Sequence, residues 1–211
     1  MLGSKTFMEY FINFFSYLIF IFFYLDIPIN IYRIGQISGD TENGVWNRND
    51  MAAMMIYAAA EQFHKIPNIE EDINWIPLNI CSASVVDLAL KSSFDISIPI
   101  DERVYHLLNP NTMKYEQYLH MLRQAGLNFV VVSQEEFLDA ILATKDLSNP
   151  LIKLSSFFQQ IYFNKSNFAT FQIDKTIQRC EILKNCPKID SNLIQLYLNY
   201  WKKPESFNEI S

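Results

Sequence analysis

The polar residues best placed to contact a ligand are concentrated in residues 36 to 47, QISGDTENGVWN. Gly, Asn, Asp and Ser favour turns and expose hydrogen-bonding groups, so this stretch is predicted to be a loop of functional length. Arg33 and Gly35 precede it. A glycine there can end a strand, or it can let the backbone approach a ligand. Asn47 and Asp50 can contact a ligand too, but helix capping is the simpler interpretation for both.

Metal and nucleic-acid chemistry are not indicated. The cysteines form no C-x-x-C pair and the histidines are far apart, whereas a zinc site needs clustered ligands. The odd number of cysteines favours a reducing compartment, so free thiols and a cytoplasmic location are predicted. The net charge of -6 comes without Lys or Arg runs, which argues against nucleic acid as a partner. His106, on an apolar stretch, is predicted to be a core histidine with satisfied hydrogen bonds. The cysteines and histidines considered as metal ligands are Cys81, Cys180, Cys186, His64, His106 and His120.

The elements that must position the loop alternate between strands and helices. A helix is predicted to begin after Asn49 or Asp50 and to end before Pro67. Another is expected to begin at Asn111 or Thr112 and to end at Gly126, and Ser133 with Glu136 forms a capping box for a third. Strands are predicted at 27–35, 73–79, 103–110 and 127–133, the last as the clearest buried strand. Only helices are predicted further on, at 151–162, 173–183 and 190–202. The pattern indicates an α/β fold with a partly parallel sheet and a helical C-terminal part.

From about residue 27 to 202 the sequence resembles the thioester reductases of amino-adipate reductases, carboxylic acid reductases and nonribosomal peptide synthetases. Residues 31 to 51, IYRIGQISGDTENGVWNRNDM, resemble an R-P-G-x-I-x-G-D segment followed by G-x-x-N-x-x-D. The matching residues are Arg33, Gly35, Gln36, Ile37, Gly39, Asp40, Gly44, Asn47 and Asp50. WIPLN, VYHLLNP and the unit from Tyr115 to Leu142 resemble later family segments in the same order. Each motif alone is weak, and their number and order carry the resemblance.

The resemblance implies the C-terminal part of a Rossmann-like, extended short-chain dehydrogenase/reductase fold with a helical substrate lobe. The family transfers a hydride from NADPH to an acyl thioester on a carrier domain and releases an aldehyde, which some members reduce to an alcohol. Four residues are then expected to face the cofactor: Arg33, Gly35, Gln36 and Ile37. Four others are expected to line the entrance for the acyl chain and the phosphopantetheine arm: Gly39, Trp46, Asn47 and Asp50.

Two parts of the family pattern are missing from the 211 residues. No G-x-x-G-x-x-G turn follows a strand, so a nucleotide-binding half is expected to be absent. GSKTFME resembles the segment after the catalytic tyrosine, which places Lys5 as the catalytic lysine and Met1 where the tyrosine should stand. That lysine lowers the pKa of the proton-donating tyrosine in the family. Without the tyrosine, a flexible terminal lysine in water is the favoured interpretation of Lys5. The chain alone is expected to be inactive.

Residues 7 to 25, FMEYFINFFSYLIFIFFYL, are apolar on every side. Their length nearly spans a bilayer, yet polar residues interrupt them. Three interpretations are a buried helix, a membrane anchor and a segment foreign to the domain. The predicted organisation is an apolar aromatic helix over 1–26, either the truncated start of the domain or a membrane anchor, followed by the C-terminal part of a thioester reductase-like domain over 27–202 and a tail over 203–211. Alternatives to the reductase are a noncatalytic interaction module and a membrane-anchored protein.

Overall fold

The computed structural model describes residues 24–25, 27–92, 97–144, 151–152, 155–156, 159 and 171–203. Lys5, nearly all of the apolar segment 7–25, most of the predicted helix 151–162 and the end of the chain lie outside these ranges. The predictions made for them remain predictions. No helix in the described part of the chain is long and apolar enough to cross a membrane.

Within the described residues, short strands form three parallel pairs. The pairs are β1 (Ile31–Ile34) with β5 (Val104–Leu107), β2 (Ile37–Ser38) with β4 (Ile76–Pro77), and β3 (Lys65–Pro67) with β6 (Val130–Val132). Parallel neighbours need long crossover connections, which helices supply here. The predicted α/β class and partly parallel pairing are confirmed.

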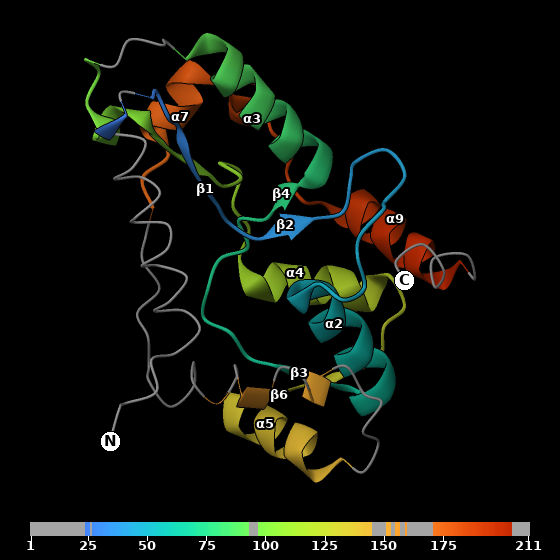
Figure 1. The fold of residues 1–211 in the computed structure, drawn as a ribbon. Coiled ribbons are helices and arrows are strands. Elements are labelled where there is room, and N and C mark those ends of the chain that lie inside the picture. The colour runs from blue at the N-terminus through green and yellow to red at the C-terminus, as the bar shows by residue number, and fades with distance from the viewer. Residues whose placement is uncertain are drawn as a thin grey trace, which may run out of the picture.

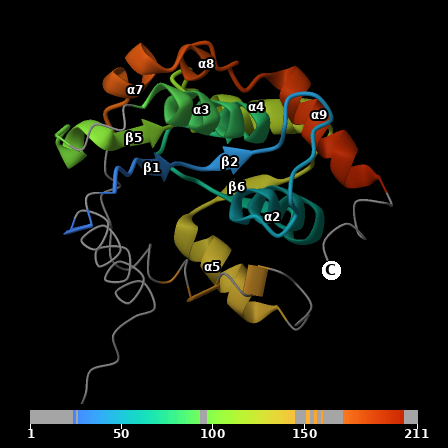
Figure 2. The same ribbon diagram turned by 45° about the horizontal axis from the view of Figure 1, so that its top comes forward.

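Helices surround these pairs. They are α2 (Met51–Ala58), α3 (Leu78–Lys91), α4 (Tyr115–Gln124), α5 (Gln134–Ala143), α7 (Asp174–Arg179), α8 (Glu181–Lys184) and α9 (Ser191–Lys202). A π-helical turn, Ala59–Phe63, extends α2, and a 3-10 turn, Ile100–Arg103, precedes β5. α3, α7 and α8 lie on one side of β1 and β2, whereas α2 and α5 lie on the other (Figures 1 and 2). The predicted helical C-terminal part is thus present as α7, α8 and α9.

Two groups of buried side chains hold the elements together. The smaller group packs α3 and α8 against β4 and β5, and it contains all three cysteines as free, buried thiols. The larger group joins α2, α4, α5 and α9, and it includes several aromatic side chains. Burial of this apolar surface is the main stabilising contribution. Free thiols were predicted from the cysteine spacing.

Local signals placed several helix ends correctly. Asp50 is the N-cap of α2, and its side chain accepts a hydrogen bond from the Ala52 amide. Ser133 and Glu136 form the predicted capping box at the start of α5. Gly126, at φ +95°, follows α4 with a backbone geometry that L side chains rarely adopt.

Two predictions about elements were wrong. α4 begins after Lys114 without a side-chain cap, so neither Asn111 nor Thr112 caps it. The strand expected to be the most buried is only β6, in which Val130 is 57% and Val131 38% exposed. Among the described strands β6 pairs with β3 alone, so its valines are left uncovered. The buried side chains of that stretch precede the strand, at Leu127 and Phe129.

Candidate functional site

A cavity of about 460 Å³ lies between α2 and α4, next to the turn that follows β1. This volume is in the range of small-molecule sites, roughly 300 to 1,000 Å³. α2, the segment 66–75 and α4 supply most of its walls. The lining residues are Gly35, Gln36, Met51, Ala52, Met55, Ile56, Ile66, Ile69, Glu71, Asp72, Ile73, Asn74, Trp75, Leu108, Tyr115, Tyr118, Leu122 and Phe171. Most of them are apolar, so the cavity suits an apolar ligand with few polar groups.

The turn between β1 and β2 forms one end of the cavity. The Gly35 amide donates to the Leu107 carbonyl at 3.0 Å, which continues the β1–β5 pairing. The Ile76 amide donates to the Gln36 carbonyl at 3.0 Å, which begins the β2–β4 pairing. A Cβ on Gly35 would lie 3.2 Å from the Leu108 side chain, so the glycine permits a close approach there. The chain changes strand partners at these two residues, and both of them line the cavity.

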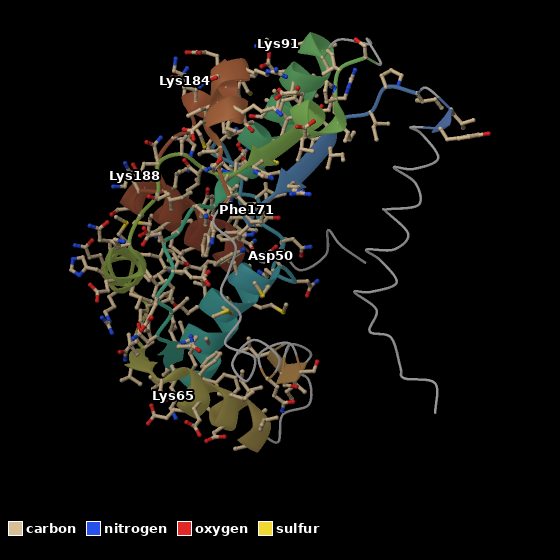
Figure 3. All side chains as sticks on the ribbon, turned by 90° about the vertical axis from the view of Figure 1, so that its left-hand side faces the viewer. Asp50, Lys65, Lys91, Phe171, Lys184 and Lys188 are labelled. Carbon is tan, nitrogen blue, oxygen red and sulfur yellow. The ribbon has the colours of Figure 1, made fainter. Side chains whose placement is uncertain are left out.

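Gln36 is fixed at the cavity edge by two hydrogen bonds. Its side-chain nitrogen donates to the Ile37 carbonyl at 2.7 Å and to Oδ1 of Asp50 at 2.9 Å. The same Asp50 oxygen accepts from the Ala52 amide at 2.9 Å. One carboxylate therefore caps α2 and orients a polar side chain of the site. Figure 3 shows Asp50 and Phe171 near the N-terminal end of α2, whereas Lys65 lies near its other end.

The cofactor-side residues occupy different environments. Arg33 is exposed, and its Nη1 lies 3.5 Å from Nε2 of His106. Ile37 pairs with Ile76 and packs on the smaller buried group. Gly35 and Gln36 line the cavity, while Arg33 lies two residues before Gly35 on β1. Contact of these four residues with a cofactor remains a prediction.

His106 is half-buried rather than a core residue, which corrects one prediction. Its hydrogen bonds are satisfied, since Nδ1 lies 3.0 Å from the Gln172 carbonyl oxygen. The imidazole ring packs against Phe171, with 4.9 Å between ring centroids. Phe171 also lines the cavity, so His106 supports one of its walls from behind. The sequence could not predict the exposure of this side chain, because a strand that is covered on one face has both buried and exposed positions.

The predicted functional loop, residues 36 to 47, contains a turn that is stabilised by the carboxylate of Asp40. Asp40 accepts hydrogen bonds from the amides of Glu42, Asn43 and Val45 at 2.7 to 2.8 Å. Burial alone would raise the pKa of Asp40, but these backbone hydrogen bonds outweigh it and lower the pKa. The loop is therefore ordered by local contacts.

The loop is also clamped to α9. A Cβ on Gly39 would lie 2.8 Å from the Tyr197 ring, and the Tyr197 hydroxyl donates to the Gly39 carbonyl at 2.9 Å. Burial raises the pKa of Tyr197 to about 12. Gly39 thus serves close packing between the loop and α9, and it does not line the cavity.

Trp46 and Asn47 have structural contacts. Trp46 is 5% exposed, and its carbonyl accepts from Nε1 of Trp201 at 3.0 Å. Its ring packs against Trp75, Tyr197 and Trp201. Asn47 is exposed, and its Oδ1 accepts from the Asn49 amide at 2.9 Å. Neither residue is among the described residues that line the cavity, and their contact with substrate remains a prediction.

Sequence reasoning missed the aromatic floor of the cavity. Tyr115 and Tyr118 point from one side of α4, and Trp75 packs edge-on against Tyr118 with ring centroids 5.1 Å apart. The Tyr118 hydroxyl is buried without a hydrogen-bond partner among the described residues, and burial raises its pKa well above the ordinary value. The spacing of the two tyrosines, three apart on a predicted helix, was the available signal. No group of three or more His, Cys, Asp or Glu that could hold a metal occurs in the described ranges.

Comparisons with known proteins agree with this fold. Residues 23–85 match an NAD-binding family model described as "Male sterility protein". The chain is 28% identical over 81% of its length to the non-reducing polyketide synthase sor2 of Hypocrea jecorina, of which it covers 6%. It is 24% identical over 84% of its length to a linear gramicidin synthase polypeptide of Brevibacillus parabrevis, of which it covers 3%. The chain thus spans a small part of the curated relatives it matches.

Solved structures show the same fold. The terminal R domain of the myxalamid biosynthetic pathway superposes with a TM-score of 0.67 at 22% identity, over 82% of this chain and 43% of that one. A thiolation-reductase di-domain from an archaeal nonribosomal peptide synthetase gives 0.60 at 16% identity, over 86% of this chain and 37% of that one. The resemblance to thioester reductase domains and the extended short-chain dehydrogenase/reductase fold predicted from the motifs are both confirmed.

Proposed function

We propose that this chain forms the substrate side of an NADPH-dependent reductase that acts on carrier-bound acyl thioesters and releases an aldehyde or an alcohol. One observation carries the proposal. The apolar cavity of about 460 Å³ begins at Gly35 and Gln36, the residues that the resemblance places beside the cofactor. A thioester bound there would have its acyl chain among apolar side chains and its carbonyl near the turn. The relatives are polyketide and peptide synthetases, which supports a carrier-bound substrate.

The described residues fit one end of the cofactor. Arg33 offers an exposed guanidinium two residues before the Gly35–Gln36 turn, so these three residues would hold the nicotinamide side. When bound, NADPH supplies the hydride. The 211 residues contain no glycine-rich turn for the pyrophosphate, so we expect a nucleotide-binding half outside these residues to contribute it.

The chain's own contribution is binding and orientation. Helix α2 and the Gln36 side chain are fixed by the same carboxylate, so one wall of the cavity is organised before substrate arrives. The apolar lining excludes water from the acyl group, which favours reduction over hydrolysis of the thioester. On the resemblance alone, Lys5 is proposed to act beside a tyrosine proton donor.

The test compares the chain alone with the chain supplied with a partner. NADPH oxidation is measured with an acyl pantetheine thioester, first with the 211-residue chain and then after adding the nucleotide-binding half of a related reductase domain. We expect no oxidation in the first case and thioester-dependent oxidation in the second. A complex that forms without NADPH oxidation would favour the interaction module instead. Turnover by the chain alone would contradict the division of roles.

The location of the protein in the cell is a separate proposal. The reductase is expected in the cytoplasm, and the apolar segment 7–25 favours membrane association as the alternative. Recovery of the full chain in the membrane fraction after an alkaline wash would support the membrane alternative. Recovery in the supernatant would support the cytoplasmic enzyme.

A further inference from the structure

We infer that the cavity between α2 and α4 selects a neutral, apolar acyl chain of limited length and discriminates against acyl chains that end in a carboxylate. The inference rests on the proposed function and names its substrate class. It is drawn from the lining of the cavity, from the sign of the charges there and from the cavity's size.

The walls that would contact an acyl chain are apolar on three sides. α2 contributes two methionines, an alanine and an isoleucine, the segment 66–75 contributes three isoleucines and Trp75, and α4 contributes Leu122 and two tyrosine rings. Such a surface binds methylene groups by removing them from water. The methionines are flexible and can adjust to the shape of different chains.

The charges at the cavity have one sign. Glu71 and Asp72 line it, whereas its described lining includes no Lys, Arg or His. Asp72 is paired with Lys114 at 2.9 Å on the exposed side. No ion pair of Glu71 is found among the described residues. Both acids are exposed, and Asp72 is already paired with Lys114, so a carboxylate on the substrate would meet the unpaired charge of Glu71 with no free cation in the described lining to compensate.

The size of the cavity limits the chain. A volume of about 460 Å³ corresponds to roughly fifteen water-sized groups at about 30 Å³ each. Trp75 forms part of the wall and is held between Tyr118 and Trp46, with ring centroids 5.1 and 5.6 Å away. A wall packed in this way resists expansion, so affinity should stop rising once the cavity is full.

The experiment measures binding to the full 211-residue chain, without turnover. The probes are acyl pantetheines in which an amide replaces the thioester, with butanoyl, hexanoyl, octanoyl and decanoyl chains, and the same chains ending in a carboxylate. Calorimetry gives the affinities, and a change in the tryptophan fluorescence of the chain that is lost in Trp75→Phe reports occupation of the cavity. We expect affinity to rise up to about fourfold per methylene, which corresponds to about 0.8 kcal/mol, until the chain fills the cavity. The carboxylated chains should bind at least tenfold more weakly than methyl-ended chains of the same length.

Three variants locate the effect. Glu71→Lys replaces an acid of the lining by a base and should strengthen binding of the carboxylated chains by about tenfold. Glu70→Lys makes the same change in charge at an exposed neighbour that does not line the cavity, and it should leave that binding unchanged. Met55→Trp fills part of the cavity and should shorten the longest chain that still gains affinity.

The outcomes separate this inference from the proposed function. If acyl pantetheines bind but the carboxylated chains bind as tightly as the others, the inference is wrong and the proposed function stands. The same holds if Glu71→Lys and Glu70→Lys behave alike. If no acyl pantetheine binds to the folded chain, both are overturned.

Discussion

One oxygen of the Asp50 carboxylate accepts two hydrogen bonds, one from a residue nearby in the sequence and one from a distant residue. It accepts from the Ala52 amide and from the Gln36 side chain, each at 2.9 Å. The sequence could predict the first contact, because an acid before a helix is a common N-cap. It could not predict the second, because Gln36 reaches Asp50 only once β1 and β2 have set the turn between them. Capping and support of the site therefore coincide at one residue.

Replacing Asp50 by alanine should destabilise the chain by about 1 to 2 kcal/mol, since an N-cap is lost and Gln36 is released. Urea unfolding followed by circular dichroism measures this loss. Asn49→Ala is the matched control, because Asn49 was the other candidate cap and the structure gives that role to Asp50. Equal losses in the two variants would contradict the assignment.

The glycines at 35 and 39 should respond differently to alanine. At Gly39 the new Cβ would meet the Tyr197 ring at 2.8 Å and the Trp46 Cβ at 3.0 Å, within packed aromatic side chains. We expect a loss of about 1 to 3 kcal/mol, typical of overpacking. At Gly35 the contact is the flexible end of Leu108 at 3.2 Å, so the loss should be smaller. Thermal unfolding of both variants tests the order, and a larger loss at Gly35 would contradict it.

At the scale of elements, the sequence predicted correctly those features whose contacts lie close together in the chain. The capping box of α5 lies within four residues and was predicted correctly. The short strands β2 and β3 were missed, because two or three residues carry no periodicity. The burial of β6 was overestimated, because three consecutive valines indicate a strand but not what covers it.

The loop over residues 40–45 should weaken on acidification. The pKa of Asp40 is lowered in the folded chain, so its charged form stabilises the fold above the ordinary value of 3.8, and this stabilisation is lost as the pH falls through the lower folded value. Asp40→Asn should be less stable than the natural chain at neutral pH, and the difference should narrow in acid. Glu42→Gln, in the same loop, is the control. Unfolding measured across the acid range tests this, and a constant difference would contradict it.

At the scale of the whole molecule, the α/β class and the order of the longer elements followed from alternating strand and helix patterns. The cavity did not follow from them. Its walls come from segments as distant as Gly35, Trp75, Tyr118 and Phe171, and only the folded chain brings them together. The motif residues Trp46 and Asn47 proved to have packing and turn contacts in the structure, because a motif records which residues occur and not which way they face.

The chain should lose stability in alkali. Burial raises the pKa of Cys186 to about 12, and that of Tyr197 likewise to about 12. Both groups are stabilised in the neutral form, so their contribution is complete below the ordinary thiol value of 9.0 and falls as the pH rises towards about 12. Urea unfolding at increasing pH should show a decreasing free energy in this window. Stability that stays level or increases there would contradict the assignment.

The position of α9 has a consequence for synthesis on the ribosome. Trp201 donates to the Trp46 carbonyl across 155 residues of sequence, and Tyr197 reaches Gly39 across 158. A nascent chain that has emerged only as far as residue 100 would still expose the Trp46 and Gly39 surfaces that α9 later covers. Such surfaces attract chaperones until the covering helix emerges. The protein should therefore become less prone to aggregation in the cell only after residues 191–202 have been translated.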